Sequence, residues 1–173
     1  MTGVQTCALP ISAALIKAAL IAGATRLPGM QPAAAIVDNN QGYGRLNLDN
    51  ILAPASPIKA IFRDQSKGLA TGGLYTLPIT VKSGGSALRV VLAYSDYPGE
   101  TLVNNLNLIL TAPDGTKYSG NQPIGAPAVP DSQNNTEAIQ VDTAAAGNWK
   151  AEVVGSNVVQ GTQDFALVCL GNV

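Results

Sequence analysis

The chain has 173 residues, a net charge of −1 and no histidine, and only 12% of its residues are charged. The absence of histidine excludes a Ser-His-Asp triad and His-ligated zinc within this sequence, and the absence of a Lys/Arg cluster argues against a nucleic-acid partner. No apolar run reaches the roughly 18 residues that a membrane-spanning helix needs, and the composition, with 18 glycines and 11 prolines, favours a compact, strand-rich fold.

The first twelve residues, MTGVQTCALPIS, match no familiar kind of N-terminal segment. A secretory signal begins with basic residues and continues in a long apolar stretch, whereas this segment has no Lys or Arg and is interrupted by Pro10. A helix start with Pro10 in its first turn and Ser12 near the cap explains only the end of the segment. Neither interpretation therefore explains the residues from Thr2 to Leu9.

Two helices are predicted in the first third of the chain. Residues 13–24, AALIKAALIAGA, are helix formers and are apolar on nearly every side, which is typical of a buried helix, with Gly23 as a suitable end. After a loop rich in Pro and Gly, residues 48–52 are expected to form a short second helix with Asn47 as its N-cap and Pro54 as its stop. Residues 55–57 have the composition of a linker.

From residue 58 onward the pattern is that of short β-strands. Seven or eight runs of β-branched, aromatic and aliphatic residues show partial alternation, and turn-forming sequences such as SGG, YPGE and AAAGN separate them. Leu106, Leu108 and Leu110 share one face of their run, and APDGT just after them is a strong hairpin signal. No helical pattern lies between the strands. The sequence therefore predicts a mainly β fold, an antiparallel jelly roll or β-sandwich preceded by the helices.

Aromatic residues of the strands leave two interpretations open. Trp149, Tyr94 and Phe165 could form a sugar-binding platform, as in some jelly rolls. Trp149 alternates with Lys150 and Glu152, however, and shares its face with apolar residues, so a ring that points into the core is favoured. The two cysteines are too few to imply a disulfide framework, and Cys169 is expected to be a small core residue of the last strand.

Two segments before residue 58 resemble the end of the catalytic domain of subtilisin-like serine proteases. In that family the nucleophilic serine lies in Gly-Thr-Ser-Met-Ala at the start of a buried helix, whose tail resembles Ala13-Ala14-Leu15-Ile16-Lys17. The domain closes with a Gly-Tyr-Gly-Arg-Val-Asn segment, which is similar to residues 42–47, GYGRLN. The resemblance implies that Tyr43 and Arg45 fasten the closing segment to the catalytic core.

The strands resemble the β-jelly-roll domain that follows the catalytic domain in one branch of the same family. Six short motifs occur in the family's order: LRVVLAYSD, LVNNLNL, APDG, NNTE, AGNW and the final strand DFALVCLG. Together with the first resemblance, they cover nearly everything from residue 13 onward. The implied organisation is a catalytic-domain remnant over residues 13–54 and a jelly roll over residues 58–173.

The resemblance also bears on the first twelve residues, which match no part of that family. Their sequence resembles the in-frame translation of a common sequencing-library adapter, so residues 1–12 are interpreted as non-native. The alternative is an unusual but genuine N-terminus. On the first interpretation the chain begins within the nucleophile helix, just beyond the catalytic serine. The helix, separated from the sheet it packed on, is then expected to be poorly anchored.

The function implied by the resemblance is that of a C-terminal fragment of a secreted subtilisin-like serine endopeptidase, itself inactive because it lacks the triad. Its partner would be the upstream catalytic domain of the same chain, and the parent's substrates would be proteins or peptides. The jelly roll would stabilise the catalytic domain or shape substrate access. The alternative is a non-catalytic β-sandwich module that binds a glycan or a protein.

The resemblance further implies calcium as a candidate cofactor. Family members often carry Asp within Asn-Asp-Leu-Asp-Leu, where this sequence has Asn105 and Asn107, whose carbonyls can ligate calcium without charge. Asp96 and Asp114 remain as carboxylates, which completes the set of four candidates. The alternative, which is favoured, is that the acids form turns and the asparagines satisfy loop backbone. The same alternatives apply to a second acidic loop, formed by Asp131, Asn134, Asn135 and Glu137.

Overall fold

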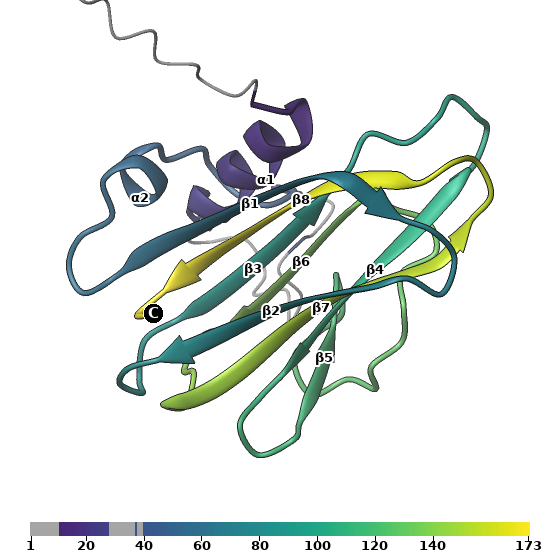
Figure 1. Cartoon of the computed structure of the whole chain (residues 1–173). Helices are drawn as coiled ribbons and strands as arrows, with labels where there is room; N and C mark the ends of the chain where they lie inside the picture. The colour runs from purple at the N-terminus through teal and green to yellow at the C-terminus, as the bar shows by residue number, and fades with distance from the viewer. Residues whose placement is uncertain (1–10, 28–36, 38–39) are drawn as a thin grey trace, which may run out of the picture.

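The computed structural model describes residues 11–27, 37 and 40–173, so most of the segment interpreted as non-native, including Cys7, lies outside the described residues. Two helices precede eight strands, and all of them lie close to the positions that the sequence predicts (Figure 1). The elements are α1 (Ala13–Gly23), α2 (Asp49–Leu52), β1 (Lys59–Leu69), β2 (Leu74–Val81), β3 (Leu88–Ala93), β4 (Asn104–Thr111), β5 (Lys117–Ser119), β6 (Thr136–Val141), β7 (Gly147–Val158) and β8 (Gln163–Gly171).

The strands form two four-stranded antiparallel sheets that face each other as a sandwich (Figure 1). The strand orders are β1-β8-β3-β6 and β2-β7-β4-β5, so successive strands pass repeatedly between the sheets in the jelly-roll arrangement. The predicted APDGT hairpin joins β4 to β5, and its turn is closed by a bond from the Gly115 amide to the Ala112 carbonyl. The mainly β prediction is confirmed.

The core between the two sheets contains the side chains that the alternation places inward. Leu106, Leu108 and Leu110 are fully buried in it, and so is Cys169 in β8. On β7, Trp149 points inward while Lys150 and Glu152 form a salt bridge of 3.0 Å on the other face. At about 25 cal/mol per Å² of buried apolar surface, this cluster is the main source of the fold's stability.

The three aromatic side chains considered for a sugar-binding platform lie in that core. Trp149, Tyr94 and Phe165 are only 3%, 2% and 2% exposed. The Trp149 indole N–H donates to the Ala145 carbonyl, and the Phe165 ring makes an edge contact with Tyr75. The core interpretation is therefore confirmed, and none of these three rings is available to stack on a sugar.

Helix α1 lies on the outer face of the β1-β8-β3-β6 sheet and is well packed there (Figure 1). Ala14, Ala18 and Ala22, which share one stripe of the helix, are buried against outward-facing residues of the sheet, namely Val91, Ala93, Ala138, Ala166 and Val168. Small side chains on both surfaces allow a close approach of helix and sheet. The expectation of a poorly anchored helix was wrong, because the sandwich itself provides a packing surface. No described helix has the length and apolarity to cross a membrane.

We expect Ala18→Leu to lower the free energy of unfolding by about 2 kcal/mol, since Ala18 has no exposed surface and a larger side chain would push the helix away from the sheet. Ala13→Leu on the exposed side of the same helix is the control, and it should change stability by less than about 0.5 kcal/mol. Urea denaturation of the two variants measures both values. Equal stabilities would show that the helix does not rest on this stripe.

Candidate functional site

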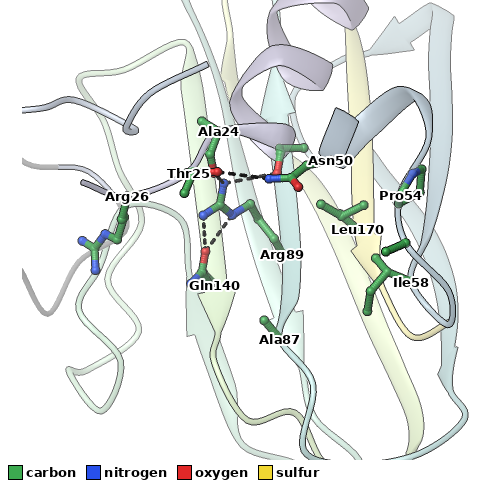
Figure 2. Close-up of a pocket in the computed structure, with 12 residues that line it drawn as sticks. Ala24, Thr25, Arg26, Asn50, Pro54, Ile58, Ala87, Arg89, Gln140 and Leu170 are labelled. Atoms are coloured by element: carbon green, nitrogen blue, oxygen red, sulfur yellow. Dashed lines mark hydrogen bonds between the residues drawn. The ribbon is translucent and has the colours of Figure 1, made fainter. Parts of the chain in front are cut away.

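The junction between the helices and the sandwich centres on Arg89, a buried charged residue of β3 (Figure 2). Its Nη1 donates to the carbonyls of Ile21 at 3.0 Å, Ala22 at 3.2 Å and Ala24 at 2.6 Å. Its Nε donates to Gln140 Oε1 at 2.7 Å, and its Nη2 binds the same oxygen. Since α1 has no basic residue in its own last turn, the sandwich provides the positive charge that the helix C-terminus favours.

The guanidinium stays charged despite its burial. Burial, together with the positive charge of Arg26, lowers the pKa of Arg89 to about 10, and Asp142 partly opposes that shift. At neutral pH the side chain therefore makes charge-assisted bonds to the helix carbonyls.

Helix α2 completes the cap. Asn50 Nδ2 donates to the Gly23 carbonyl at 2.9 Å and to Thr25 Oγ1 at 3.1 Å. A cavity of about 460 Å³ lies beside these groups, with Arg89, Gln140 and Asn50 at its polar end and Ile58 and Leu170 on its apolar wall (Figure 2). Its polar groups already hold the helix end.

The closing segment, GYGRLN, also bridges to the sandwich. Arg45 and Thr25 exchange two backbone hydrogen bonds of 2.8 Å, which ties the segment to the end of α1. The Tyr43 hydroxyl approaches the Thr136 carbonyl at 3.3 Å and Asn121 Oδ1 at 3.5 Å, and both acceptors belong to the jelly roll. Burial raises the pKa of Tyr43 to about 12, so it remains a neutral donor. Tyr43 therefore fastens the segment to the sandwich.

Two further contacts hold the other end of α1. The Asp64 carboxylate on β1 accepts from the Ser12 amide at 3.1 Å and from the Ser12 hydroxyl at 2.8 Å. Lys17 Nζ donates to Asn135 Oδ1 at 3.3 Å, and burial lowers the pKa of Lys17. A carboxylate at the N-terminus and a guanidinium at the C-terminus both match the helix dipole.

In the second acidic loop, both carboxylate oxygens of Asp131 accept two hydrogen bonds each. Asp131 Oδ1 accepts from the amides of Gln133 at 2.8 Å and Asn134 at 3.1 Å. Asp131 Oδ2 accepts from the side chains of Asn121 at 2.7 Å and Asn134 at 2.8 Å. Desolvation opposes ionisation, but these bonds outweigh it and lower the pKa of Asp131. The carboxylate thereby organises the loop.

The two carboxylates among the four calcium candidates each accept hydrogen bonds from backbone amides. Asp96 accepts from the amides of Tyr97 at 2.8 Å, Val103 at 2.8 Å and Asn104 at 3.0 Å, so its carboxylate closes the loop between β3 and β4. Asp114 accepts from the Thr116 amide at 2.9 Å in the β4–β5 hairpin, and that bond is the main cause that lowers the pKa of Asp114.

The two asparagines lie on β4 and bond to each other. Asn107 Nδ2 donates to Asn105 Oδ1 at 3.1 Å and to Ser156 Oγ at 2.5 Å, while Asn107 Oδ1 is buried without a hydrogen-bond partner. Within the described part of the chain, no group of three or more His, Cys, Asp or Glu residues is placed to hold a metal ion. Calcium binding by these four residues remains a prediction.

Sequence reasoning did not mark two titratable residues, Arg89 and Glu137, as residues of the interior. Arg89 stands as a single charge within the apolar run LRVVLA, and that isolation is the signal that could have marked it. Glu137 was noted only as part of an acidic loop, yet it is fully buried between the sheets.

Comparisons with known proteins give distant similarity to serine proteases. No protein-family model matches the chain. It is 39% identical over 77 residues, 40% of its length, to the serine protease/ABC transporter B family protein tagB of Dictyostelium discoideum, and 26% identical over 175 aligned residues, 91% of its length, to tagA of the same organism. The second alignment extends beyond the sandwich. The chain spans only 4% and 10% of these relatives, so their overall activities are not assigned to it.

Solved structures match the chain only at low similarity. The Aeromonas sobria serine protease, solved in complex with its chaperone, has a TM-score of 0.35 at 14% identity, and the match covers 93% of this chain and 40% of the protease. A family 35 carbohydrate-binding module from Cellvibrio japonicus has a TM-score of 0.36 at 20% identity, with coverage of 77% and 79%. These matches carry no functional argument.

Proposed function

We propose that the chain is the C-terminal part of a secreted subtilisin-like serine endopeptidase, with residues 13–54 as the end of the catalytic domain and residues 58–173 as a jelly roll that holds it in place. One observation carries the proposal. Arg89 of the sandwich binds the last carbonyls of α1, the helix whose sequence resembles the tail of the nucleophile helix. The jelly roll is thereby joined to the element that would carry the catalytic serine.

The outer side of the helical region supports an upstream partner from the same polypeptide. Ile16 on α1 is 52% exposed and Leu52 on α2 is 75% exposed, and Leu46 and Leu48 between them are also exposed. A helix that is apolar all round is normally covered on both sides. The proposed cover is the rest of the catalytic domain.

In this proposal the 173-residue chain does not hydrolyse peptides. It has no histidine, and the hydroxyl of Ser12 is bonded to Asp64 at 2.8 Å and caps α1. The competing glycan-binding module loses its aromatic platform, since the three rings are buried. No specific observation favours it.

The test begins with the genomic sequence upstream of the Ala13 codon, where a Gly-Thr-Ser-Met-Ala reading frame is expected. In the full-length parent, truncation after residue 57 should accelerate thermal inactivation of peptidase activity, and Arg89→Met should do so to a smaller extent. Arg63→Met, on the exposed surface of β1, is the matched control. An unrelated upstream domain, or inactivation and substrate preference that are unchanged without the jelly roll, would refute the proposal.

A further inference from the structure

Glu137 of β6 is a carboxylic acid enclosed in the interior of the sandwich. It has no exposed surface, and it shares the inward side of β6 with Ile139 and Val141. Its Oε2 accepts from the Leu108 amide of β4, in the opposite sheet, at 2.8 Å. Its Oε1 is buried and has no hydrogen-bond partner. The side chain therefore connects the two sheets through one oxygen and leaves the other without compensation for its lost hydration.

The position of Glu137 follows from how the chain passes between the sheets at this point. β5 ends at Ser119, and the Gly120 amide makes one more bond to the Leu108 carbonyl at 3.0 Å. The next residue, Asn121, pairs instead with β6, because its amide donates to the Ala138 carbonyl at 2.9 Å and its Oδ1 accepts from the Ala138 amide at 3.1 Å. Glu137 fills the corner made by this crossing and accepts the Leu108 amide there.

The surroundings disfavour a negative charge on Glu137. Its neighbours across the strands, Leu92 on β3 and Leu108 on β4, are apolar, and the titratable groups near it are Asp131, Tyr94 and Tyr43. No salt bridge forms to it among the described residues. Burial, to which the Asp131 charge adds, raises the pKa of Glu137 to about 9, although the Leu108 bond opposes the shift. Burial likewise raises the pKa of Tyr94, so that this phenol is neutral as well.

We propose that Glu137 is a protonation-controlled latch, which as a neutral acid closes the corner between the two sheets and on ionisation opens it. The consequence reaches the helical region, since the Tyr43 hydroxyl rests on Asn121 and Thr136, the residues beside the latch. Opening of the corner would release the acidic loop and Tyr43 together. This inference concerns the chain itself and does not depend on the proposed protease origin.

The raised pKa of Glu137 determines how the stability of the closed corner changes with pH. A carboxyl group whose pKa is about 9 in the folded chain and near its ordinary value of 4.5 when exposed retains its proton on folding. The closed corner therefore loses stability as pH rises from about 4.5 to about 9, and its opening equilibrium should increase about tenfold per pH unit in that window.

Carboxyl NMR of the intact chain tests the latch directly. The chain contains three glutamates, so labelling glutamate with carbon-13 at Cδ gives three resonances. Glu100→Gln, at an exposed position, and Glu152→Gln, at a partly buried position on the outer face of β7, assign the remaining signal to Glu137. We expect that signal to titrate near pH 9. A midpoint near 4.5 would overturn the proposal.

Amide hydrogen exchange tests the opening. After correction for base catalysis, protection of the Ala138 amide should fall about tenfold per pH unit in the wild type above pH 4.5 and stay level in Glu137→Gln. Glu152→Gln serves as the matched acid-to-amide control and should behave like the wild type. The same pH dependence in Glu137→Gln as in the wild type would also overturn the latch. If Glu137→Gln does not fold, the carboxyl titration of the wild type decides alone.

Discussion

Replacement of Arg89 by methionine is expected to lower the free energy of unfolding by about 3 kcal/mol. Methionine retains most of the apolar stem but removes every donor, so the carbonyls of Ile21, Ala22 and Ala24 and the side chain of Gln140 lose their partner. Charge-assisted hydrogen bonds contribute more than neutral ones, and a buried acceptor left alone incurs its full desolvation cost. The loss of positive charge at the end of α1 adds a smaller term of roughly 0.5 kcal/mol.

Urea denaturation and amide exchange together check this prediction. Arg63→Met on β1 is the control, because Arg63 lies on an exposed surface and, within the described part of the chain, its guanidinium donates only to the neighbouring Phe62 carbonyl. It should change stability by less than about 0.5 kcal/mol. Arg89→Lys should recover only part of the loss, since a single ammonium group lacks the separate donors with which the guanidinium reaches both the helix carbonyls and Gln140. If Arg89→Met and Arg63→Met prove equally stable, the guanidinium does not hold the helix, and the proposed role of the jelly roll loses its main support.

The strands could be predicted from the sequence because each one carries its own signal. Leu106, Leu108 and Leu110 alternate with residues of the opposite face, and the APDGT turn is local chemistry. The second helix was predicted one residue too early, at residues 48–52 with Asn47 as its N-cap, whereas α2 begins at Asp49 and its N-cap is Leu48, which makes no side-chain cap bond. Asn47 Oδ1 nevertheless accepts from the Asp49 amide at 3.1 Å, just before the helix. In each case the signal lies within a few residues of the structure it specifies.

The junction could not be predicted in the same way because its partners are far apart in the sequence. Arg89 meets Ala22 and Ala24 across more than sixty residues, and nothing local in either segment indicates the other. The apolar periodicity of α1 shows that the helix is buried, but it does not identify the surface that buries it. The sequence thus led to the expectation of a poorly anchored helix, which the alanine-lined contact with the sheet corrects.

The surroundings of the candidate calcium residues also depend on contacts that the local sequence does not indicate. Asp96 and Asp114 are residue types that can bind a metal, and in the structure their carboxylates accept hydrogen bonds from backbone amides, so calcium binding there remains a prediction. Glu137, in contrast, directly follows a polar stretch, and nothing in the local sequence indicates that its side chain is buried between the two sheets. Residue type indicates what a side chain is able to bind, whereas the path of the chain decides whether it meets water, an amide or another charge.

The corner beside Glu137 should tolerate no side chain at position 120, and Gly120→Ala is expected to lower the free energy of unfolding by about 3 kcal/mol. A Cβ on Gly120 would overlap Glu137 Oε2 and lie 2.5 Å from Glu137 Cβ. Both residues are buried, and Gly120 is held by its bond to the Leu108 carbonyl, so neither can move away freely. The smaller unfolded-state entropy of alanine offsets only roughly 0.5 to 1 kcal/mol of this cost.

A double-mutant cycle separates the steric cause from the charge of the acid. Gly120→Ala should cost the same in the Glu137→Gln background, since glutamine keeps the shape of glutamate, but clearly less in Glu137→Ala, where the overlapping carboxyl group is gone. Gly84→Ala, at an exposed turn where the nearest atom to the new Cβ is 3.3 Å away, is the control and should cost less than about 0.5 kcal/mol. Chemical denaturation at pH 6 suits the cycle, because the shift of Glu137 keeps the carboxyl group protonated in the folded chain at that pH. If the Gly120→Ala penalty is unchanged in Glu137→Ala, the two residues do not share the corner, and the enclosure on which the latch depends is absent.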